Sequence, residues 1–470
     1  MNTIIDIEAK IGDVKEEKKK ERFLGLVGTK YKTNWFLLLF IFLIPLRNIQ
    51  LKYFPNFGGG LNFLNIGLLL SIAGMLIVGG TLSKDCSVNK RMLVLILYMI
   101  FSLFVGYRTI HGDTSDHFNV LKDTVVAMSL LFVVQKSVRD WVGFRRIFAA
   151  TLLPLPYMTY VVWNQYSSVA KWHYYDGLRI SGTFADLGAN ELGAFFVTTA
   201  LVMTALFFVV NKKIWKMILL GSLLLAFVGI MFSYSRAAYL SYAAGAMVIF
   251  LLYKNKLKML PYLLIGIIAI AAVVPTSVVE RFDTITTNTG KMDESEKSRL
   301  VFWGIAADYM KQHPIIGLGY YTFHHKQINP FGMDTHNYFV KVMVEQGVIG
   351  MLILLSLFFG IYRTARRRYR EGEETKNDWQ KGFSIAMAAA LAGLMVGNMF
   401  GDRFSYYPLI SYFWIYTGLL LAMGNFEKTS EETEETYRTD IWGDRMGHLE
   451  KTSQETEETY RTDIWGDRIV

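Results

Sequence analysis

The sequence has 470 residues, of which 52% are hydrophobic and only 19% are charged, a balance that argues against two or three ordinary soluble domains. The formal net charge is +9, but long apolar runs separate the basic residues, which points to a membrane rather than to a nucleic-acid partner. The single cysteine, Cys86, excludes a disulfide framework and a cysteine-based zinc site.

The chain begins with a basic and polar segment, residues 1–34, that is too long for the n-region of a cleavable signal peptide. We expect it to lie in the cytoplasm near anionic lipid. Apolar runs follow, and we identify about twelve that reach the roughly 20 residues needed to cross a bilayer. Nine lie within residues 35–276 and three within residues 336–425. Their centres are near Phe40, Ala73, Leu97, Ser129, Leu155, Thr199, Leu225, Ala246, Ile267, Leu352, Ala390 and Trp414.

The segments between these runs alternate between basic and nearly uncharged. The basic set includes the N-terminal segment, the lysines at 212, 213 and 216, and the run RTARRRYR from Arg363. The positive-inside rule places this set, and with it both termini, in the cytoplasm. The sequence therefore predicts an all-α, polytopic membrane protein with about 12 transmembrane helices and a long extracytoplasmic loop.

That loop covers residues 277–335 and is much longer than its neighbours. It contains the amphipathic stretch EKSRLVFWGIAADYMKQ from Glu296, which we expect to lie along the membrane surface or to cap a cavity. The apolar stripe at helical spacing comprises Leu300, Trp303, Ala307 and Met310. Long loops in tight bundles are usually functional.

The C-terminal segment, residues 426–470, is a tandem duplication. Residues 427–445 and 450–468 differ only at Glu431 and Gln454, and from residue 427 onward the chain has 13 acidic and 6 basic residues. The remaining residues, 1–426, therefore carry 43 basic and 27 acidic residues. We interpret the duplicated segment as a disordered cytoplasmic tail. A doubled docking motif and an artificial addition are the alternatives.

Three arginines lie on the expected outer side, where the positive-inside rule disfavours them: Arg179, Arg236 and Arg403. Each could be an interfacial anchor whose guanidinium reaches the lipid head groups. Arg236 lies in the tight turn of a helical hairpin with no acid nearby in sequence, so it needs another reason. Arginines that converge on one outer cavity would bind a phosphate or diphosphate, because the guanidinium fork matches phosphate oxygens.

Four of the eight histidines fall in the long loop or at its end, but their spacing does not match a metal site. His336 stands where the loop enters the next apolar run. Its ordinary pKa suits proton abstraction from a hydroxyl group. Alternatively, Asp334 or Thr335 caps the helix and His336 is only interfacial. We find no nucleotide-binding, lipase or zinc-protease motif.

Residues 313–350 resemble the core of the O-antigen ligase and O-antigen polymerase superfamily. The resemblance rests on the ordered motifs P-x-x-G-x-G, H-N and E-x-G-x-x-G, which here comprise Pro314, Gly317, Gly319, His336, Asn337, Glu345, Gly347 and Gly350. The segments SYSRAAYLS, RISGTFADLGANELG and SRLVFWGIA are similar to further family segments, and the resemblance covers roughly residues 35–425. The chain departs from the family at residues 186–190, where Asn-Pro-Asn is common and this sequence reads DLGAN.

The resemblance implies a metal-independent, inverting glycosyltransferase of the bacterial cytoplasmic membrane that needs no cofactor. It would move a glycan from undecaprenyl diphosphate to a hydroxyl of a glycan, lipid or cell-wall acceptor on the outer face. For that chemistry we expect Arg179 and Arg236, with Arg299 and Arg403 as secondary candidates, to bind the diphosphate. We expect His336 to act as the general base or to position the acceptor. The motif residues that would support this site are Asn337, Glu345, Gly317 and Gly319.

Two alternatives remain open from the sequence. A polymerase that extends lipid-linked repeat units shares the same motifs. A membrane transporter is the second alternative, because about twelve spans with both ends inside is a common transporter plan. The sequence shows no internal repeat between its halves and no matching pair of Gly/Pro-broken spans, which disfavours a transporter.

Overall fold

The computed structural model describes residues 25–26, 31–54, 62–83, 86–169, 179–261 and 294–426, and its regular elements there are all helices. The N-terminal part contains α2 (Trp35–Leu43), α3 (Arg47–Tyr53), α4 (Phe63–Val78), α5 (Cys86–Thr109), α6 (Ser115–Ser137), α7 (Trp141–Leu152) and α8 (Leu155–Val169). The remainder contains η1 (Gly182–Leu187), α9 (Ala189–Val209), α10 (Lys213–Phe232), α11 (Arg236–Leu252), α14 (Glu294–Gln312), α15 (Tyr338–Glu374), α16 (Asp378–Met399), α17 (Tyr407–Ala422) and η2 (Met423–Asn425).

Within these described ranges, seven helices are long and apolar enough to cross a membrane, and the bent pair α2–α3 would make eight. The axes of α2 and α3 meet at 104°. The described part of the chain is therefore all-helical, and its long apolar helices are those of a multi-pass membrane protein. The predicted centres at Leu352, Ala390 and Trp414 fall in α15, α16 and α17. The centre near Ile267 lies outside the described residues, so the twelve-span layout stays a prediction.

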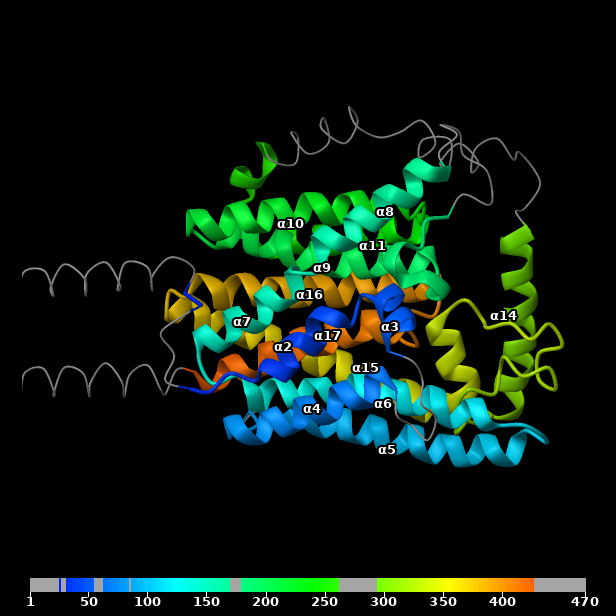
Figure 1. Cartoon of the computed structure of the whole chain (residues 1–470). Helices are drawn as coiled ribbons and strands as arrows, with labels where there is room; N and C mark the ends of the chain where they lie inside the picture. Colours follow the sequence, from blue (N-terminus) through cyan, green and yellow to red (C-terminus); the bar gives the residue numbers. More distant parts are fainter. Residues whose placement is uncertain are drawn as a thin grey trace, which may run out of the picture. The chain divides into compact units, whose positions relative to one another are not determined.

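Three helices form the core of the bundle. The apolar windows of α9, α16 and α17 are 83%, 78% and 94% buried, far more than the 28% of α10, because other helices surround them. Helix α16 packs against α9, α11 and α15, and α17 packs against α6. Figure 1 shows α16 and α17 between a group formed by α8, α10 and α11 and a group formed by α4, α5 and α6.

Small residues let α11 and α16 approach closely. A Cβ atom at Gly245 of α11 would lie 2.9 Å from the carbonyl oxygen of Ala389, and one at Gly393 of α16 would lie 2.9 Å from that of Ser241. Helices in a bilayer associate through such close backbone packing. The contact fixes the start of α11, which carries Arg236, relative to the end of α16, which is followed by Arg403.

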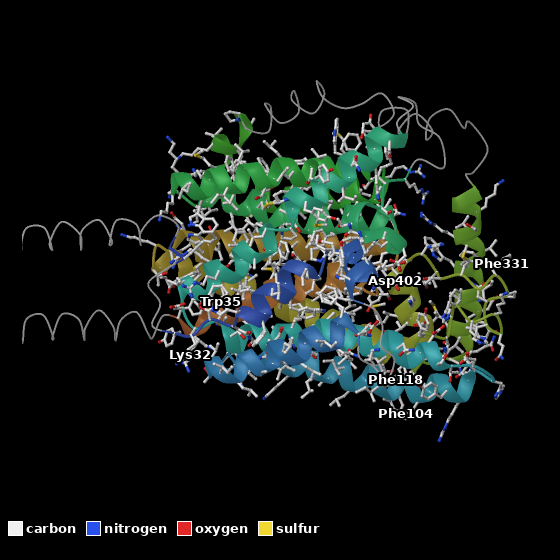
Figure 2. The ribbon with its side chains drawn as sticks, viewed as in Figure 1. Lys32, Trp35, Phe104, Phe118, Phe331 and Asp402 are labelled. Atoms are coloured by element: carbon white, nitrogen blue, oxygen red, sulfur yellow. The ribbon has the colours of Figure 1, made fainter. Side chains whose placement is uncertain are left out.

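The outside of the bundle is apolar. Figure 2 labels Phe104 of α5 and Phe118 of α6, whose side chains are 61% and 55% exposed. Large apolar residues that stay exposed over a helical surface indicate contact with lipid or a partner. Because backbone hydrogen bonds are satisfied within helices, this surface is compatible with the hydrocarbon core of a membrane.

Helix α14 forms where an amphipathic helix was predicted, and it crosses the end of the bundle in Figure 1. Its buried face is offset from the predicted stripe, with Met310 common to both. Phe302 and Ala306 are buried, whereas Leu300 is 52% exposed. Phe302 and Ala306 form a hydrophobic cluster with residues of the loop that precedes α15, and Ile305, Tyr309 and Met310 pack against this cluster. The side of α14 that faces this loop is therefore the buried one, and it is offset from the side that the sequence predicted.

A candidate active site at one end of the bundle

The structure brings five predicted site residues to the wall of one cavity of about 520 Å³. These residues are Arg179, Arg236, Arg299, Arg403 and His336. They come from five separate places: the segment before η1, the first turn of α11, α14, the loop after α16 and the loop before α15. Acidic residues, including Asp334 and Asp402, also line the cavity. The tertiary fold therefore gathers the arginines that the sequence singled out.

Arg236 occupies the first position of α11. The side chain of Ser235 caps the helix by accepting a hydrogen bond from the amide of Ala238. Only three residues separate α11 from the end of α10 at Phe232, so the hairpin turn is tight. A cation at a helix N-terminus faces the positive end of the helix dipole, which is unfavourable by up to about 1 kcal/mol. Helix stability therefore does not explain the choice of arginine at this position.

Arg403 is in a different environment from Arg179. Arg179 is exposed, whereas Arg403 is 4% exposed and forms an ion pair with the carboxylate of Glu191 in the first turn of α9. The amide of Arg403 donates a hydrogen bond to the Asn398 side chain at 2.9 Å. A buried ion pair of this kind fixes geometry. Arg403 therefore joins α9 to the end of α16 besides contributing to the cavity wall.

His336 is held at the cavity by its neighbours. Its φ angle is +54°, a conformation that few non-glycine residues adopt. The indole nitrogen of Trp303 in α14 donates a hydrogen bond to the carbonyl oxygen of Thr335 at 2.9 Å, and the rings of Phe302 and His336 lie 6.0 Å apart. A strained backbone held by packing on both sides is typical of a functional position.

The electrostatics around His336 keep its imidazole neutral. Burial lowers the pKa of His336 below its ordinary value, because the charged form loses solvation, and the guanidinium groups of Arg299 and Arg403 act in the same direction. The carboxylates of Asp334 and Asp402 oppose this shift without reversing it. A neutral imidazole at neutral pH can accept a proton, which is the form that a general base requires.

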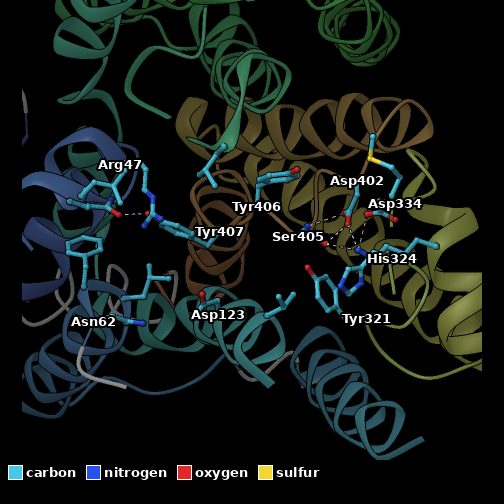
Figure 3. A pocket seen from close by; sticks show the side chains of 18 of the residues that line it. Arg47, Asn62, Asp123, Tyr321, His324, Asp334, Asp402, Ser405, Tyr406 and Tyr407 are labelled. Carbon is cyan, nitrogen blue, oxygen red and sulfur yellow. Dashed lines mark hydrogen bonds and ion pairs between the residues drawn. The ribbon is translucent and has the colours of Figure 1, made fainter. Parts of the chain in front are cut away.

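A second cavity of about 800 Å³ meets the first at a shared wall. Asp334, His336, Asp402 and Tyr406 line both cavities. The second cavity extends between the helices toward Arg47, Gln50, Asp123 and Tyr407 (Figure 3). Its lining combines hydroxyl, amide and carboxylate groups, which can hydrogen-bond to a ligand, with apolar side chains such as Leu51 and Phe63. His336 therefore stands between two spaces large enough for two ligands.

Lys341 lines the second cavity and holds together two carboxylates of the shared wall. Its ammonium group lies 2.7 Å from Asp402 Oδ2 and 3.1 Å from Asp334 Oδ2, and the side chain is 8% exposed. Burial alone would raise the pKa of Asp334, but Lys341 outweighs it and holds the pKa below the usual value. The Ser405 amide donates to Asp402 Oδ1 at 3.1 Å. One cation thus joins the loop before α15 to the loop before α17, and Figure 3 shows the carboxylates of Asp334 and Asp402 close to each other.

His324 and Tyr321 lie beside this network in the second cavity. Their rings are 3.8 Å apart, and Lys341 lies 5.3 Å from the Tyr321 ring centre. Burial, reinforced by the nearby Lys341 charge, lowers the pKa of His324 to about 4. His324 is therefore neutral across the physiological range and, unlike His336, lines only the second cavity.

Asn337 caps helix α15. Its side-chain oxygen accepts hydrogen bonds from the amides of Phe339 and Val340 at 3.0 and 3.2 Å. The alternative that Asp334 or Thr335 caps this helix is therefore wrong. Asp334 instead binds the amide of Thr335 at 2.7 Å and pairs with Lys341. Asn337 fixes where α15 begins and so fixes the position of the preceding His336.

The glycine motifs and Glu345 form a junction beneath the site. Helix α15 is interrupted at Gly347, which has φ 63° and ψ −168°. The preceding loop runs alongside the interruption, and the amides of Leu318 and Gly319 donate to the carbonyl oxygens of Val344 and Glu345 at 2.9 and 2.7 Å. Non-helical backbone at membrane depth is tolerated only where such partners satisfy it.

The Glu345 carboxylate completes this junction. It accepts hydrogen bonds from the amides of Tyr321 and Phe323 at 3.0 and 3.2 Å. Gly317 and Gly319 allow the close approach, since a Cβ atom at Gly317 would lie 2.4 Å from the Glu345 backbone carbon. Glu345, Gly317 and Gly319 therefore support the fold around the site and do not line either cavity.

Sequence reasoning missed Lys341, Asp402 and Glu191 as members of the site. A signal for two of them was present. Glu191 and Lys341 each lie in the first turn or turns of a span that is otherwise apolar, and charges at that depth are rare without a partner or a function. Their partners could not be read from the sequence, because Glu191 and Arg403 are 212 residues apart.

Comparison with known proteins finds one family model that matches part of the chain. Residues 221–355 match the family model described as O-antigen ligase, and this range contains Arg236, Arg299 and His336. A comparison with curated proteins finds no match. Together with the membrane-length helices, the family match indicates a multi-pass bacterial membrane protein of glycan assembly, acting as an O-antigen ligase or in a polymerase-like way. The match supports, over residues 221–355, the resemblance to the O-antigen ligase superfamily.

Proposed function

We propose that the protein transfers a glycan from undecaprenyl diphosphate to a hydroxyl group of an acceptor, as an O-antigen ligase does. One observation carries this proposal: His336 lies on the wall shared by an arginine-lined cavity and a second cavity. A general base must lie within hydrogen-bond reach of the acceptor hydroxyl while that hydroxyl faces the donor, and a position between two ligand spaces suits this task.

The arginine-lined cavity suits the diphosphate of the lipid-linked donor. Arg179 and Arg236 are the principal ligands in this proposal, and Arg299 and Arg403 line the same space. Guanidinium groups bind phosphate oxygens in a bidentate manner. They stabilise the charge that develops on the leaving diphosphate, a task that arginine, lysine or Mg²⁺ can perform. The proposed reaction therefore uses no metal ion and no cofactor.

The second cavity would hold the acceptor. The acceptor oxygen attacks the anomeric carbon while the bond from that carbon to the diphosphate oxygen breaks. The proton of the hydroxyl passes to the neutral imidazole of His336, and undecaprenyl diphosphate leaves with the bonding electron pair. Attack from the side opposite the leaving group inverts the anomeric centre, which agrees with two cavities on either side of one residue.

The basic connecting segments support a location in the cytoplasmic membrane with both termini inside. In that orientation Arg179, Arg236 and Arg403 face the outside, where we propose the transfer takes place. The long α15, of 37 residues, begins beside His336 and ends in the arginine-rich run from Arg363. The site and this basic run thus lie at opposite ends of one helix, as the proposed orientation requires.

An assay with purified protein in nanodiscs tests the proposal. The protein is mixed with a glycan on undecaprenyl diphosphate and an acceptor, and free undecaprenyl diphosphate is measured. Acceptor-dependent release supports transfer, whereas a transporter would release none. With a lipid A core acceptor, a single transfer indicates a ligase. Longer lipid-linked chains formed without that acceptor indicate a polymerase.

A further inference from the structure

A third cavity, of about 480 Å³ and lined mainly by arginines, lies at the other end of α15. It is lined by two hydroxyl residues and five arginines: Ser87, Thr364, Arg91, Arg363, Arg366, Arg367 and Arg370. Ser87 and Arg91 come from α5, and the others come from the last turns of α15. No acidic side chain is among the described residues that line this space. None of these residues belongs to the proposed active site.

The arginines differ in how they are held. The Arg91 guanidinium donates a hydrogen bond to the carbonyl oxygen of Ser356 at 3.0 Å, and it fills the space next to Gly360. Arg367 approaches Glu371 at 3.4 Å. Arg363, Arg366 and Arg370 have exposed side chains. Five like charges around one small space repel each other, and an anion between them would remove that repulsion.

An apolar surface continues from this cavity along the same stripe of α15. Phe359 is one turn before Arg363 and lies under its guanidinium, 5.9 Å from ring centre to Cζ. Leu352, Leu355 and Phe359 are 61%, 39% and 56% exposed. On α5, Val94 follows Arg91 by one turn and is 49% exposed. A cationic cavity above an apolar stripe matches a phosphate headgroup with acyl chains.

We infer that this cavity between α5 and α15 binds the headgroup of an anionic phospholipid, with the acyl chains along the exposed stripe of α15. The positive-inside rule accounts for basic residues near this end of the helix. It does not account for their convergence on one concave space or for the adjoining apolar stripe. The inference is independent of the glycan-transfer proposal, because it concerns the opposite end of α15.

Native mass spectrometry of the full-length protein with phosphatidylglycerol tests the inference. The variant R363Q/R366Q/R370Q removes three exposed charges from the cavity. The matched control K212Q/K213Q/K216Q removes three charges from another basic segment. We expect the cavity variant to retain at least about tenfold less phosphatidylglycerol, since each basic residue near an anionic surface contributes about 1 kcal/mol. The control should retain as much as the wild type, and neither variant should change retention of phosphatidylcholine.

Equal retention by the cavity variant and the wild type would overturn the inference, and so would an equal loss in both variants. Inorganic phosphate, added at the same molar concentration as the lipid, separates a lipid site from a free-anion site. We expect no displacement, because the acyl chains add to the affinity, and full displacement would contradict the lipid assignment. If the triple variant is not monodisperse, R366Q and R370Q are measured singly, and each should lower retention about twofold or more.

Discussion

Lys341 Nζ lies 2.7 Å from Asp402 Oδ2, and this buried pair joins the first turn of α15 to the loop that leads into α17. Asp334 Oδ2 lies 3.1 Å from the same ammonium group. His336 and Arg403, the proposed base and one of the proposed diphosphate ligands, are each within two residues of one of these carboxylates. The relative position of two functional loops therefore depends on one lysine.

Replacing Lys341 with methionine should destabilise the protein. The change leaves Asp402 and Asp334 without their cation in a largely buried place, and we expect the free energy of unfolding to fall by about 3 kcal/mol. Thermal unfolding in detergent measures the effect. The matched control is Lys311→Met, which removes an exposed pair with Asp308 at 3.1 Å, worth less than about 1 kcal/mol. Equal effects of the two changes would contradict the role given to Lys341.

Arg236→Lys should lower kcat/KM for the lipid-linked donor by about tenfold or more. The change retains the positive charge but loses the guanidinium fork that binds phosphate in a bidentate manner. The control is Arg108→Lys, at the exposed end of α5 and not among the residues that line the cavity. Full activity of Arg236→Lys would show that Arg236 is only an interfacial anchor.

The pH dependence of transfer should reflect the lowered pKa of His336. The neutral imidazole is the active form, and a lowered pKa keeps it neutral to a lower pH. Activity should therefore persist at pH 6.5 and fall only at lower pH, so that the acid limb of kcat/KM has its midpoint below 6.5. A midpoint above 6.5 would contradict this environment for a general base.

Arg299→Gln tests the same electrostatics in the opposite direction. Arg299 is one of the causes that lower the pKa of His336, so its removal should move the acid limb of kcat/KM to higher pH. The same profile measured on wild type and variant gives the shift directly. An acid limb that stays in place would mean that Arg299 does not act on the titrating group.

Gly319→Ala should disrupt the junction under the site. The φ angle of Gly319 is +106°, and a Cβ atom there would lie 2.1 Å from the amide nitrogen of Gly106 in α5. We expect a loss of more than about 2 kcal/mol in the free energy of unfolding, since the added Cβ atom meets backbone atoms, which cannot move aside as a flexible side chain could. Gly304→Ala in α14 is the control, because a Cβ atom there meets nothing within 4 Å. That change should be neutral or stabilising.

The sequence predicted the class of fold and the position of the motifs because both depend on patterns among neighbouring residues. Apolar runs, alternating loop charge and the amphipathic stretch all act over neighbouring residues. Three details depend on distant contacts and could not be predicted. They are the 104° bend between α2 and α3, the interruption of α15 at Gly347, and the face of α14 that is buried.

In the candidate site, too, some residues could be identified from local sequence patterns, whereas their partners depend on the fold. Arg179, Arg236 and Arg403 could be selected because each is a cation in a segment that we expect on the outer side, where the positive-inside rule disfavours it. Lys341 and Asp402 could not be paired, because 61 residues separate them and only the packing of α15, α16 and α17 brings them together. The sequence thus indicates which charges need a partner, and the fold decides which partner each one has.

The most direct test of the account is the rate of undecaprenyl diphosphate release by His336→Ala in the purified, reconstituted protein. The account predicts that this variant folds, still binds the lipid-linked donor because the arginines are intact, and loses at least about 100-fold in acceptor-dependent release. Release at a rate close to that of the wild type would contradict the assignment of His336 as the base between the two cavities.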